Sequence, residues 1–194
     1  MNSKTSAPRP FPVSHAWVLD NPLGRAQAKR ILGRLQIEPG MHVVDIGCGP
    51  GRLTLPVARI VGANGEVLAV DLQSAMLTIV ERRATGEGLQ NVRTMQAAAG
   101  SGALPPGQFD LALLSFVLGE IPPERREPAI REIAAALRPG GTLAVVEGIF
   151  DPHRQSREAV LALVETVGLR LEREHRRLTH ALFVFRNPSP PSVH

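Results

Sequence analysis

The sequence predicts an α/β fold in which a doubly wound, mostly parallel sheet ends in a C-terminal antiparallel hairpin, all within a single domain. Two observations lead to this prediction. Short apolar runs alternate along the chain with segments of helical periodicity, which is the pattern of βαβ units. The 194 residues, of which 43% are hydrophobic, suit one domain with its own core. We place this domain at residues 13–186 and expect the Pro- and Ser-rich segments 1–12 and 187–194 to be mobile tails.

The predicted strands follow one another at regular intervals. A helix over 22–35 comes first, because Leu23, Ile31 and Leu35 approximate helical spacing before Pro39 and Gly40 break the pattern. Strand-like runs then lie at 42–46, 66–71, 92–96, 109–114 and 142–147. Since these runs are apolar on both faces, they fit a parallel sheet that is covered by helices.

Helical segments separate the strands and lead to the hairpin. They lie at 52–62, at 74–86 with Ser74 as the candidate N-cap, before a stop at Arg138-Pro139-Gly140-Gly141, and at 156–167 closed by Gly168. In the third of these helices the apolar side chains at i, i+3, i+4 and i+7 mark the buried face, namely Ile130, Ile133, Ala134 and Leu137. The final stretch LRLEREHRRLTHALFVFR predicts two strands that form a hairpin at the sheet edge.

Composition excludes several classes of function. The single cysteine, Cys48, cannot form an internal disulfide or a thiolate cluster, and the six histidines show no zinc-binding spacing, so we expect no metal. The net charge is only +4 and the arginines are mixed with Glu, which argues against a nucleic-acid partner. No apolar run reaches the ~18 residues of a membrane span, and the N-terminus lacks a secretory pattern, so we predict a cytoplasmic protein. The sequence does not indicate an oligomeric state.

The glycine turn GCGPG, which follows the strand-like run at 42–46, is the first candidate binding element. Its glycines allow a ligand to approach the backbone closely, and the helix after it attracts an anion by ~0.3–1 kcal/mol. Asp45 lies two residues before Gly47, where its carboxylate would repel a pyrophosphate but attract an ammonium group. The spacing also departs from the dinucleotide GxGxxG pattern, and no GxxxxGK[ST] segment is present. These features favour the amino-acid part of a ligand at this turn.

A second acid identifies the rest of that ligand. Asp71 ends the second predicted strand, at the position where doubly wound folds carry the acid that binds both ribose hydroxyls. A ribose at Asp71 and a zwitterionic amino acid near Asp45 together describe S-adenosylmethionine better than NAD.

Four stretches then resemble a known family. VVDIGCGPG, VLAVDLQSAML, FDLALLSFVLGEIP and LRPGGTLAVVE, in this order, are similar to the motifs of class I S-adenosylmethionine-dependent methyltransferases, which have a Rossmann-like fold. The resemblance covers residues 23–186 and is most similar to the small methyltransferases of ubiquinone and menaquinone biosynthesis. It implies that the methionine part is held by Asp45, Gly47, Cys48, Gly49 and Gly51, the ribose by Asp71, and that Leu72 and Met76 lie beside adenine.

One departure from the family concerns adenine. Relatives often carry Gly-Asp-Ala after the third strand, but this chain has Ala98 where that Asp would stand. Gln96, or the backbone near Ala97, would have to replace the missing carboxylate.

The acceptor side is expected beyond the carboxyl ends of the fourth and fifth strands, because ligands of open α/β sheets bind there. Ser115 and Glu120 follow the fourth strand, and Glu147 and Phe150 follow the fifth. We take Glu120 and Glu147 as the candidate catalytic residues, which would orient or deprotonate the acceptor, and place Ser115 with the cofactor-binding residues. His15 and His153 could arrive from flanking loops, and Trp17 is a candidate lid.

The predicted function is methyl transfer by in-line displacement to a small, hydrophobic or aromatic acceptor. Two alternatives stay open: a non-catalytic module that binds S-adenosylmethionine or S-adenosylhomocysteine, and an RNA methyltransferase that uses the arginines. The absence of an Asn-Pro-Pro-Tyr tetrapeptide after the fourth strand weighs against nucleobase amines as acceptors. Arsenite methyltransferases need several cysteines, which this chain does not have.

Overall fold

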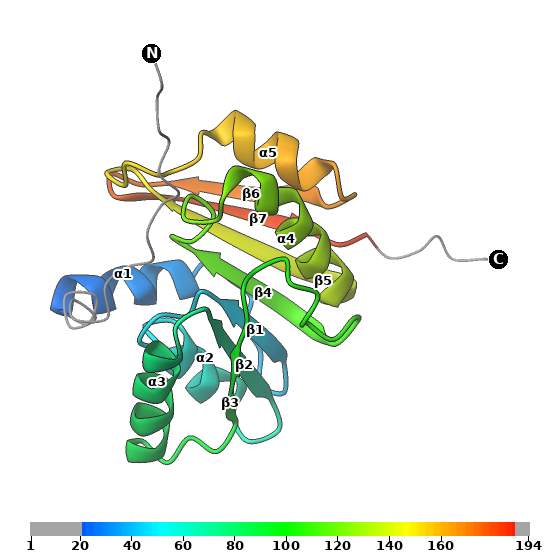
Figure 1. The fold of residues 1–194 in the computed structure, drawn as a ribbon. Helices are drawn as coiled ribbons and strands as arrows, with labels where there is room; N and C mark the ends of the chain where they lie inside the picture. Colours follow the sequence, from blue (N-terminus) through cyan, green and yellow to red (C-terminus); the bar gives the residue numbers. More distant parts are fainter. Residues whose placement is uncertain (1–20, 189–194) are drawn as a thin grey trace.

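The computed structural model describes residues 21–188 of the chain, and within them a seven-stranded sheet carries helices on both faces (Figure 1). The elements in chain order are α1 (Pro22–Leu32), β1 (His42–Ile46), α2 (Thr54–Val61), β2 (Glu66–Asp71), α3 (Ser74–Gly86), β3 (Val92–Gln96), β4 (Phe109–Ser115), α4 (Pro123–Ala136), β5 (Leu137–Gly148), α5 (Arg157–Glu165), β6 (Arg170–Arg176) and β7 (His180–Arg186). Trp17, His15 and the predicted tail 1–12 lie outside the described residues.

The strand order is β3-β2-β1-β4-β5-β7-β6. Strands β1 to β5 run parallel to one another, while β7 pairs antiparallel with both β5 and β6. The order reverses between β1 and β4, where Val44 is paired with Leu68 on one side and Ala112 on the other. The predicted doubly wound sheet and its C-terminal edge hairpin are confirmed, and the reversal creates the crevice in which such folds bind ligands.

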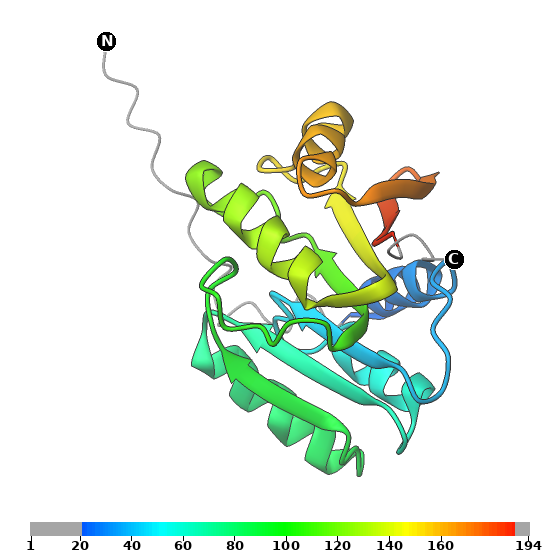
Figure 2. The same ribbon diagram turned by 90° about the vertical axis from the view of Figure 1, so that its right-hand side faces the viewer.

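Strands β1, β2, β4, β5 and β7 are mostly buried on both faces, which explains their apolar runs, whereas the edge strands β3 and β6 are partly exposed. Val44 and Ile46 of β1 pack with Ile130 of α4 and Val160 of α5 on one face, whereas Val43 packs with residues of α1 and α2 on the other. Figure 2 shows α4 and α5 on one side of the sheet and α1, α2 and α3 on the opposite side. The sheet is therefore the middle layer of three, and its strand ends are fixed by packing from both sides.

The end of α4 differs from the prediction. The helix stops at Ala136 and β5 begins at Leu137, several residues before the predicted stop at Gly140 and Gly141. Pro139 cannot donate a helical hydrogen bond, and Gly140 has a φ of 78°, so this stretch leaves the helix early and pairs with β4 through a shift of register.

Asn187, which we placed in a tail, is also bound here, because its side-chain amide donates to the carbonyls of Leu137 and Arg138 at 3.2 and 3.1 Å.

The start of α3 also departs from the prediction. Ser74 is not the N-cap; Gln73 occupies that position, and no side chain makes a capping hydrogen bond from it. The backbone N–H of Gln73 instead donates to the carboxylate of Asp71 at 2.8 Å. The acid at the end of β2 thus stabilises the turn into α3.

Among residues 21–188, no helix is both long enough and apolar enough to cross a membrane.

Candidate cofactor and acceptor site

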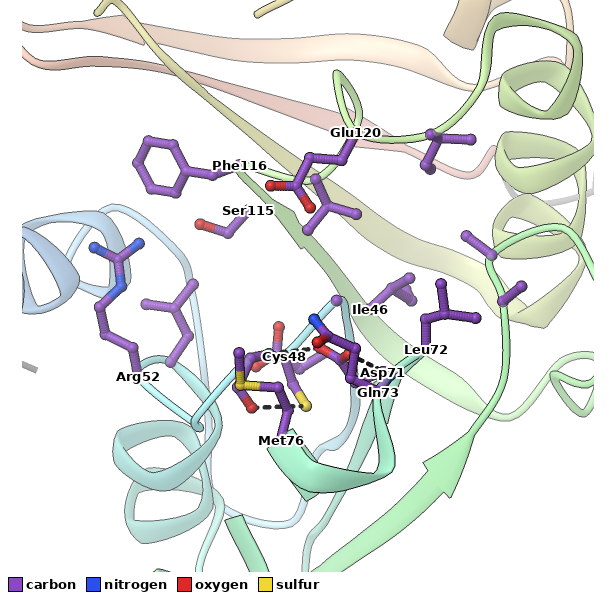
Figure 3. Close-up of a pocket in the computed structure, with 18 of the residues that line it drawn as sticks. Ile46, Cys48, Arg52, Asp71, Leu72, Gln73, Met76, Ser115, Phe116 and Glu120 are labelled. Carbon is purple, nitrogen blue, oxygen red and sulfur yellow. Dashed lines mark hydrogen bonds between the residues drawn. The ribbon is translucent and has the colours of Figure 1, made fainter. Parts of the chain in front are cut away.

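A cavity of about 580 Å³ opens at the carboxyl ends of β1, β2 and β4, where the strand order reverses. The glycine turn after β1 forms its floor, the turn into α3 forms one wall, and the segment after β4 forms the opposite wall (Figure 3). Residues that are distant in sequence meet here because parallel strands bring their carboxyl ends to one edge of the sheet.

The glycine turn has a backbone that other residues would not adopt without strain. Gly47, Gly49 and Gly51 have φ values of 66°, 52° and 86°. A Cβ on Gly47 would also lie 2.3 Å from the side chain of Val117. The N–H groups of Gly47 and Cys48 donate to the carbonyl of Val70 at 2.8 and 3.0 Å, so the turn is joined to β2 and stays open toward the cavity.

Asp71 joins the turn to α3. One carboxylate oxygen accepts from the N–H of Gly49 at 2.9 Å, and the other accepts from the N–H of Gln73 at 2.8 Å. A carboxylate oxygen has two acceptor positions, so each oxygen retains one for a further donor. Asp71 lines the cavity, and its geometry suits the two neighbouring hydroxyls of a ribose.

Asp45 lies deeper in the same cavity, with 2% of its surface exposed. The hydroxyl of Thr54 donates to its carboxylate at 2.6 Å. Burial raises the pKa of Asp45 to about 6, while the Thr54 hydrogen bond and the charge of Arg52 act against that rise. A ligand ammonium group at this position would favour the ionised carboxylate.

Arg52 is a residue of the site that the sequence analysis missed. Its guanidinium lies 4.9 Å from the centre of the Phe116 ring and donates to the side-chain carbonyl of Gln27 at 2.8 Å. Burial lowers the pKa of Arg52, and the charge of Asp45 opposes that effect. Arg52 and Asp45 therefore place a cation and an anion in one cavity, as a zwitterionic amino acid requires. The signal in the sequence was a basic residue directly after the last glycine of the turn.

The segment after β4 carries the polar groups on the acceptor side. The Glu120 carboxylate points into the cavity (Figure 3), and burial followed by the like charges of Asp151 and Asp71 raises its pKa to about 7. The hydroxyl of Ser115 also lines the cavity, and it is buried without a hydrogen-bond partner among the described residues. An unpaired buried hydroxyl costs free energy, so this atom marks a place where a ligand group would be stabilised.

Close backbone approaches hold this segment in place. Among residues 21–188, Phe116 is the non-glycine residue with a positive φ, at 61°, which is a strained conformation for a bulky side chain. Gly148 leaves room for the Phe116 ring, since a Cβ there would lie 3.0 Å from it. A Cβ on Gly119 would lie 2.0 Å from the carbonyl oxygen of His153. The wall that carries Glu120 is thus fixed from two directions.

Most of the predicted site residues line this single cavity: Asp45, Gly47, Cys48, Gly49, Asp71, Leu72, Met76, Ala97, Ser115 and Glu120. Gly51 supports the turn from behind, because its α-carbon faces Val80 and Leu55. The side chain of Cys48 is buried, and burial raises the pKa of its thiol well above the usual range, which disfavours the reactive thiolate.

Two predicted residues are not brought to the cavity. The amide of Gln96 donates to the carbonyl of Leu72 at 3.1 Å and lies outside the lining, so Ala97, Ala98 and Ala99 border the expected adenine end instead. Glu147 lines a second, separate cavity and therefore does not stand beside Glu120 as we expected. Its side chain shares the sheet face of Leu143 and Val145, which α4 and α5 cover.

The loop residues expected near the acceptor are also displaced. Phe150 is 81% exposed, and neither it nor His153 lines the cavity. Asp151, from the same loop, does line it and contributes to the raised pKa of Glu120. Within residues 21–188, no group of three or more His, Cys, Asp or Glu side chains is arranged to hold a metal ion.

The order of the strands, the acidic residues at the carboxyl ends of β1 and β2 and the glycine turn after β1 define a class I methyltransferase fold. Residues 43–141 match the methyltransferase domain family, and this chain belongs to that family. The resemblance to this family and S-adenosylmethionine as its cofactor are thereby confirmed.

Curated relatives carry a more specific name. The ubiquinone/menaquinone biosynthesis C-methyltransferase UbiE of Azotobacter vinelandii is 38% identical over 112 residues, which are 57% of this chain and 44% of that protein. The enzyme of the same name from Vibrio vulnificus is 36% identical over 118 residues, 59% of this chain and 45% of that protein. The matched part thus spans less than half the length of these relatives.

Solved structures agree on the fold. A SAM-dependent methyltransferase from Aquifex aeolicus has a TM-score of 0.81 at 22% identity, with 91% of this chain and 98% of that chain covered. The [4+2]-cyclase SpnF has a TM-score of 0.75 at 18% identity, with 86% and 82% covered. Because the second of these is named for a different reaction, the fold by itself does not determine the chemistry.

Proposed function

We propose that this protein transfers the methyl group of S-adenosylmethionine to a small aromatic acceptor with an ionisable hydroxyl group, and that Glu120 takes up the proton. The observation that carries the proposal is the position of Glu120, a carboxyl group with a pKa near 7 in the cavity that also contains Asp71. A base whose pKa is close to the working pH is efficient at removing a proton during reaction.

The cofactor would be held by residues of this chain that fit its parts. Asp71 offers one free acceptor position on each oxygen to the ribose, and the Asp45 and Arg52 side chains match the ammonium and carboxylate of the methionine part. The small side chains of Ala97, Ala98 and Ala99 leave space for adenine beside Leu72. When bound, S-adenosylmethionine supplies an activated methyl group, so the protein has mainly to align the acceptor and exclude water.

The acceptor would enter on the side of Glu120, Ser115 and Phe116. Apolar side chains of Val117, Ile121 and Pro122 border that part of the cavity, which suits a hydrophobic ring. Glu120 would remove the hydroxyl proton, which raises the electron density of the ring and of its oxygen, while the Ser115 hydroxyl would donate to the developing negative charge. The names of the curated relatives, which refer to C-methylation in quinone biosynthesis, support an acceptor of this type.

The two alternatives are less well supported. A non-catalytic module would not need a carboxyl group of raised pKa in its cavity. Arg157, Arg176 and Arg186, from α5, β6 and β7, are paired with the β6 acids Glu172 and Glu174, so this edge of the sheet is not a purely basic face. An RNA acceptor would require such a face.

The experiment that tests the proposal follows tritium from the methyl group of S-adenosylmethionine into a panel of phenols, hydroquinones and naphthols, with short RNA and nucleosides included. We expect label in an aromatic product and equimolar S-adenosylhomocysteine. Label only in RNA, or tight S-adenosylhomocysteine binding without turnover on any fraction of cell extract, would replace this proposal with one of the alternatives.

A further inference from the structure

The second cavity, which we call the Glu147 cavity, has a volume of about 430 Å³ and lies beside the end of β5, under the start of α5. It is lined by Glu147, Gly148, Ile149, Arg154, Gln155, Ser156, Arg157, Glu158, Arg176, Ala181 and Phe183. None of these residues lines the cofactor cavity, and the loop between β5 and α5 separates the two. Nothing in the proposed methyl transfer uses the Glu147 cavity.

Glu147 is the buried polar group of this cavity, with 4% of its surface exposed. One carboxylate oxygen accepts from the backbone N–H of Gln155 at 3.0 Å. The other oxygen is buried and has no hydrogen-bond partner among residues 21–188. Burying a carboxyl oxygen without a hydrogen-bond partner costs free energy. A ligand that brought a hydrogen-bond donor or a shared proton to this oxygen would therefore be stabilised in the Glu147 cavity.

Three guanidinium groups surround the same space. Arg157 and Arg176 both donate to Glu174, at 2.9 and 2.7 Å, and so are held beside each other by one carboxylate outside the lining. Within the described part of the chain, the side chain of Arg154 makes neither a hydrogen bond nor an ion pair. Arg157 and Arg176 already share Glu174, so Arg154 is the guanidinium that is left for a ligand, and its charge favours an anionic ligand over a cationic one.

The charged groups that face Glu147 come from every element packed against it. Asp151 and Arg154 belong to the loop, Arg126 to α4, Arg157 and Glu158 to α5, and Arg176 with its partner Glu174 to β6. Burial raises the pKa of Glu147 to about 7, and Asp151 adds to the rise, whereas Gln155, Arg126 and Arg154 oppose it. Glu147 can therefore gain a proton near neutral pH when a second anion arrives, as happens when two like charges share a site.

We propose that the Glu147 cavity binds a phosphate group, as the free ion or as a phosphate monoester, together with one proton that the phosphate and the Glu147 carboxyl share. Phosphate oxygens accept hydrogen bonds from guanidinium groups in well-defined geometry, and Arg154 is available for this. The shared proton supplies the unpaired oxygen of Glu147 with a partner. A cation would be repelled by the arginines of the lining. Sulfate does not take up a proton near neutral pH, so the shared proton would have to stay on the Glu147 carboxyl, and we expect sulfate to bind more weakly than phosphate.

The neighbouring contacts indicate what the site would affect. Gln155 donates its backbone N–H to Glu147 and accepts from Arg126 through its side-chain carbonyl at 2.8 Å. Arg126 also donates to the carbonyls of Ile121 and Gly119, at 2.9 and 3.4 Å, on either side of Glu120. A phosphate at Glu147 would thus contact the network that fixes the wall of the cofactor cavity.

The test is calorimetric titration of the full chain with inorganic phosphate at about pH 8, where phosphate is mostly a dianion, in two buffers of different ionisation enthalpy. We expect binding with uptake of about one proton. Glu147→Gln should bind phosphate without that uptake, and Arg154→Ala should weaken binding at least about tenfold, the loss expected for a hydrogen bond between charged groups. Arg170→Ala, at the opposite end of β6, is the matched control and should change nothing.

Three results would overturn the proposal. These are no binding at millimolar phosphate, equal affinity for sulfate and phosphate without proton uptake (an adventitious ion only), and unchanged binding in Arg154→Ala. A phosphate monoester that carries an aliphatic group, titrated in parallel, distinguishes a free-phosphate site from a monoester site. Since methyl transfer is not the readout, failure of this proposal and failure of the proposed function remain distinguishable.

Discussion

The carboxylate of Asp71 accepts a hydrogen bond from the backbone N–H of Gly49 at 2.9 Å. This contact joins the acid at the end of β2 to the glycine turn after β1, so the two parts of the cavity that we propose for different ends of one ligand are directly connected. Changes at Asp71 should consequently affect both the ribose contact and the shape of the turn.

Asp71→Ala should weaken the binding of S-adenosylhomocysteine at least about tenfold, because hydrogen bonds to a charged group contribute about 1.5–3 kcal/mol each. Calorimetry gives the affinity, and thermal unfolding of the same variant reports the loss of the Gly49 and Gln73 contacts. Ser74→Ala, whose side chain caps nothing, is the control. Unchanged affinity in Asp71→Ala, or a preference of the parent protein for NAD, would contradict our placement of the ribose.

Arg52→Ala should weaken S-adenosylhomocysteine binding by about tenfold or more while leaving 5′-methylthioadenosine binding nearly unchanged. The physical reason is that the smaller nucleoside lacks the carboxylate that Arg52, held by Gln27 and the Phe116 ring, would meet. Competition titration with the two nucleosides measures the difference. Equal losses for both ligands would mean that Arg52 only supports the fold of the turn.

Glu120→Gln should lower kcat by ~10²–10⁴-fold with little change in cofactor affinity, because a general base contributes about that much. In the parent protein kcat/KM should fall as the pH drops through about 7, since Glu120 must be deprotonated to accept a proton. The variant should lose this limb of the pH profile. Glu124→Gln, which replaces an exposed glutamate in the first turn of α4, is the matched control. A parent-like profile in Glu120→Gln would remove Glu120 from the reaction.

Glu147→Gln should stabilise the protein at about pH 8, by up to about 3 kcal/mol. Because the folded-state pKa of Glu147, about 7, lies above the unfolded value near 4.5, the folded state binds more protons between these values, and its stability decreases as the pH rises through this window. A neutral side chain avoids this loss and still accepts from Gln155. Urea unfolding at about pH 5 and 8 measures it; an equal or lower stability of the variant at pH 8 would refute the prediction.

Gly119→Ala should destabilise the protein by about 1–3 kcal/mol, because the new methyl group would lie 2.0 Å from the carbonyl oxygen of His153 and backbone cannot yield easily. Gly86→Ala, at the end of α3 with open space around it, should be neutral or slightly stabilising. Urea unfolding of the pair tests the contact. Equal stabilities would show that the loop after β5 moves away at little cost.

The central strands could be predicted from sequence because both of their faces are buried. His42–Ile46 and Glu66–Asp71 have the predicted bounds, since apolar runs between turns leave little freedom in where a buried strand begins and ends. The edge strand Val92–Gln96 also has the predicted bounds, although it is partly exposed. The junction between α4 and β5 was less predictable, because Leu137 satisfies the helical period and also pairs with Phe109 of β4. Tertiary pairing determined the outcome there.

The site was predictable in position but only partly in orientation. The sequence predicts that Glu120 and Glu147 lie beyond the ends of adjacent strands. Successive side chains of a strand point to opposite faces of the sheet, and Glu147 is on the face that α5 covers, so its side chain lies outside the cofactor cavity. The sequence did not predict Arg52 as a site residue, because its contacts with Gln27 and Phe116 join segments that are far apart in sequence. Such contacts depend on how helices pack on the sheet, which the motifs do not encode.

The strand β6 has a further consequence for behaviour in concentrated solution. It is an outer strand whose alternating arginines and glutamates form ion pairs with one another and with α5 and β7, as in Arg157–Glu174 and Arg186–Glu172. A second molecule that tried to extend the sheet from this border would have to break these pairs and bury charges of both signs. The charged edge strand β6 therefore disfavours edge-to-edge aggregation, which an apolar strand at the same position would promote.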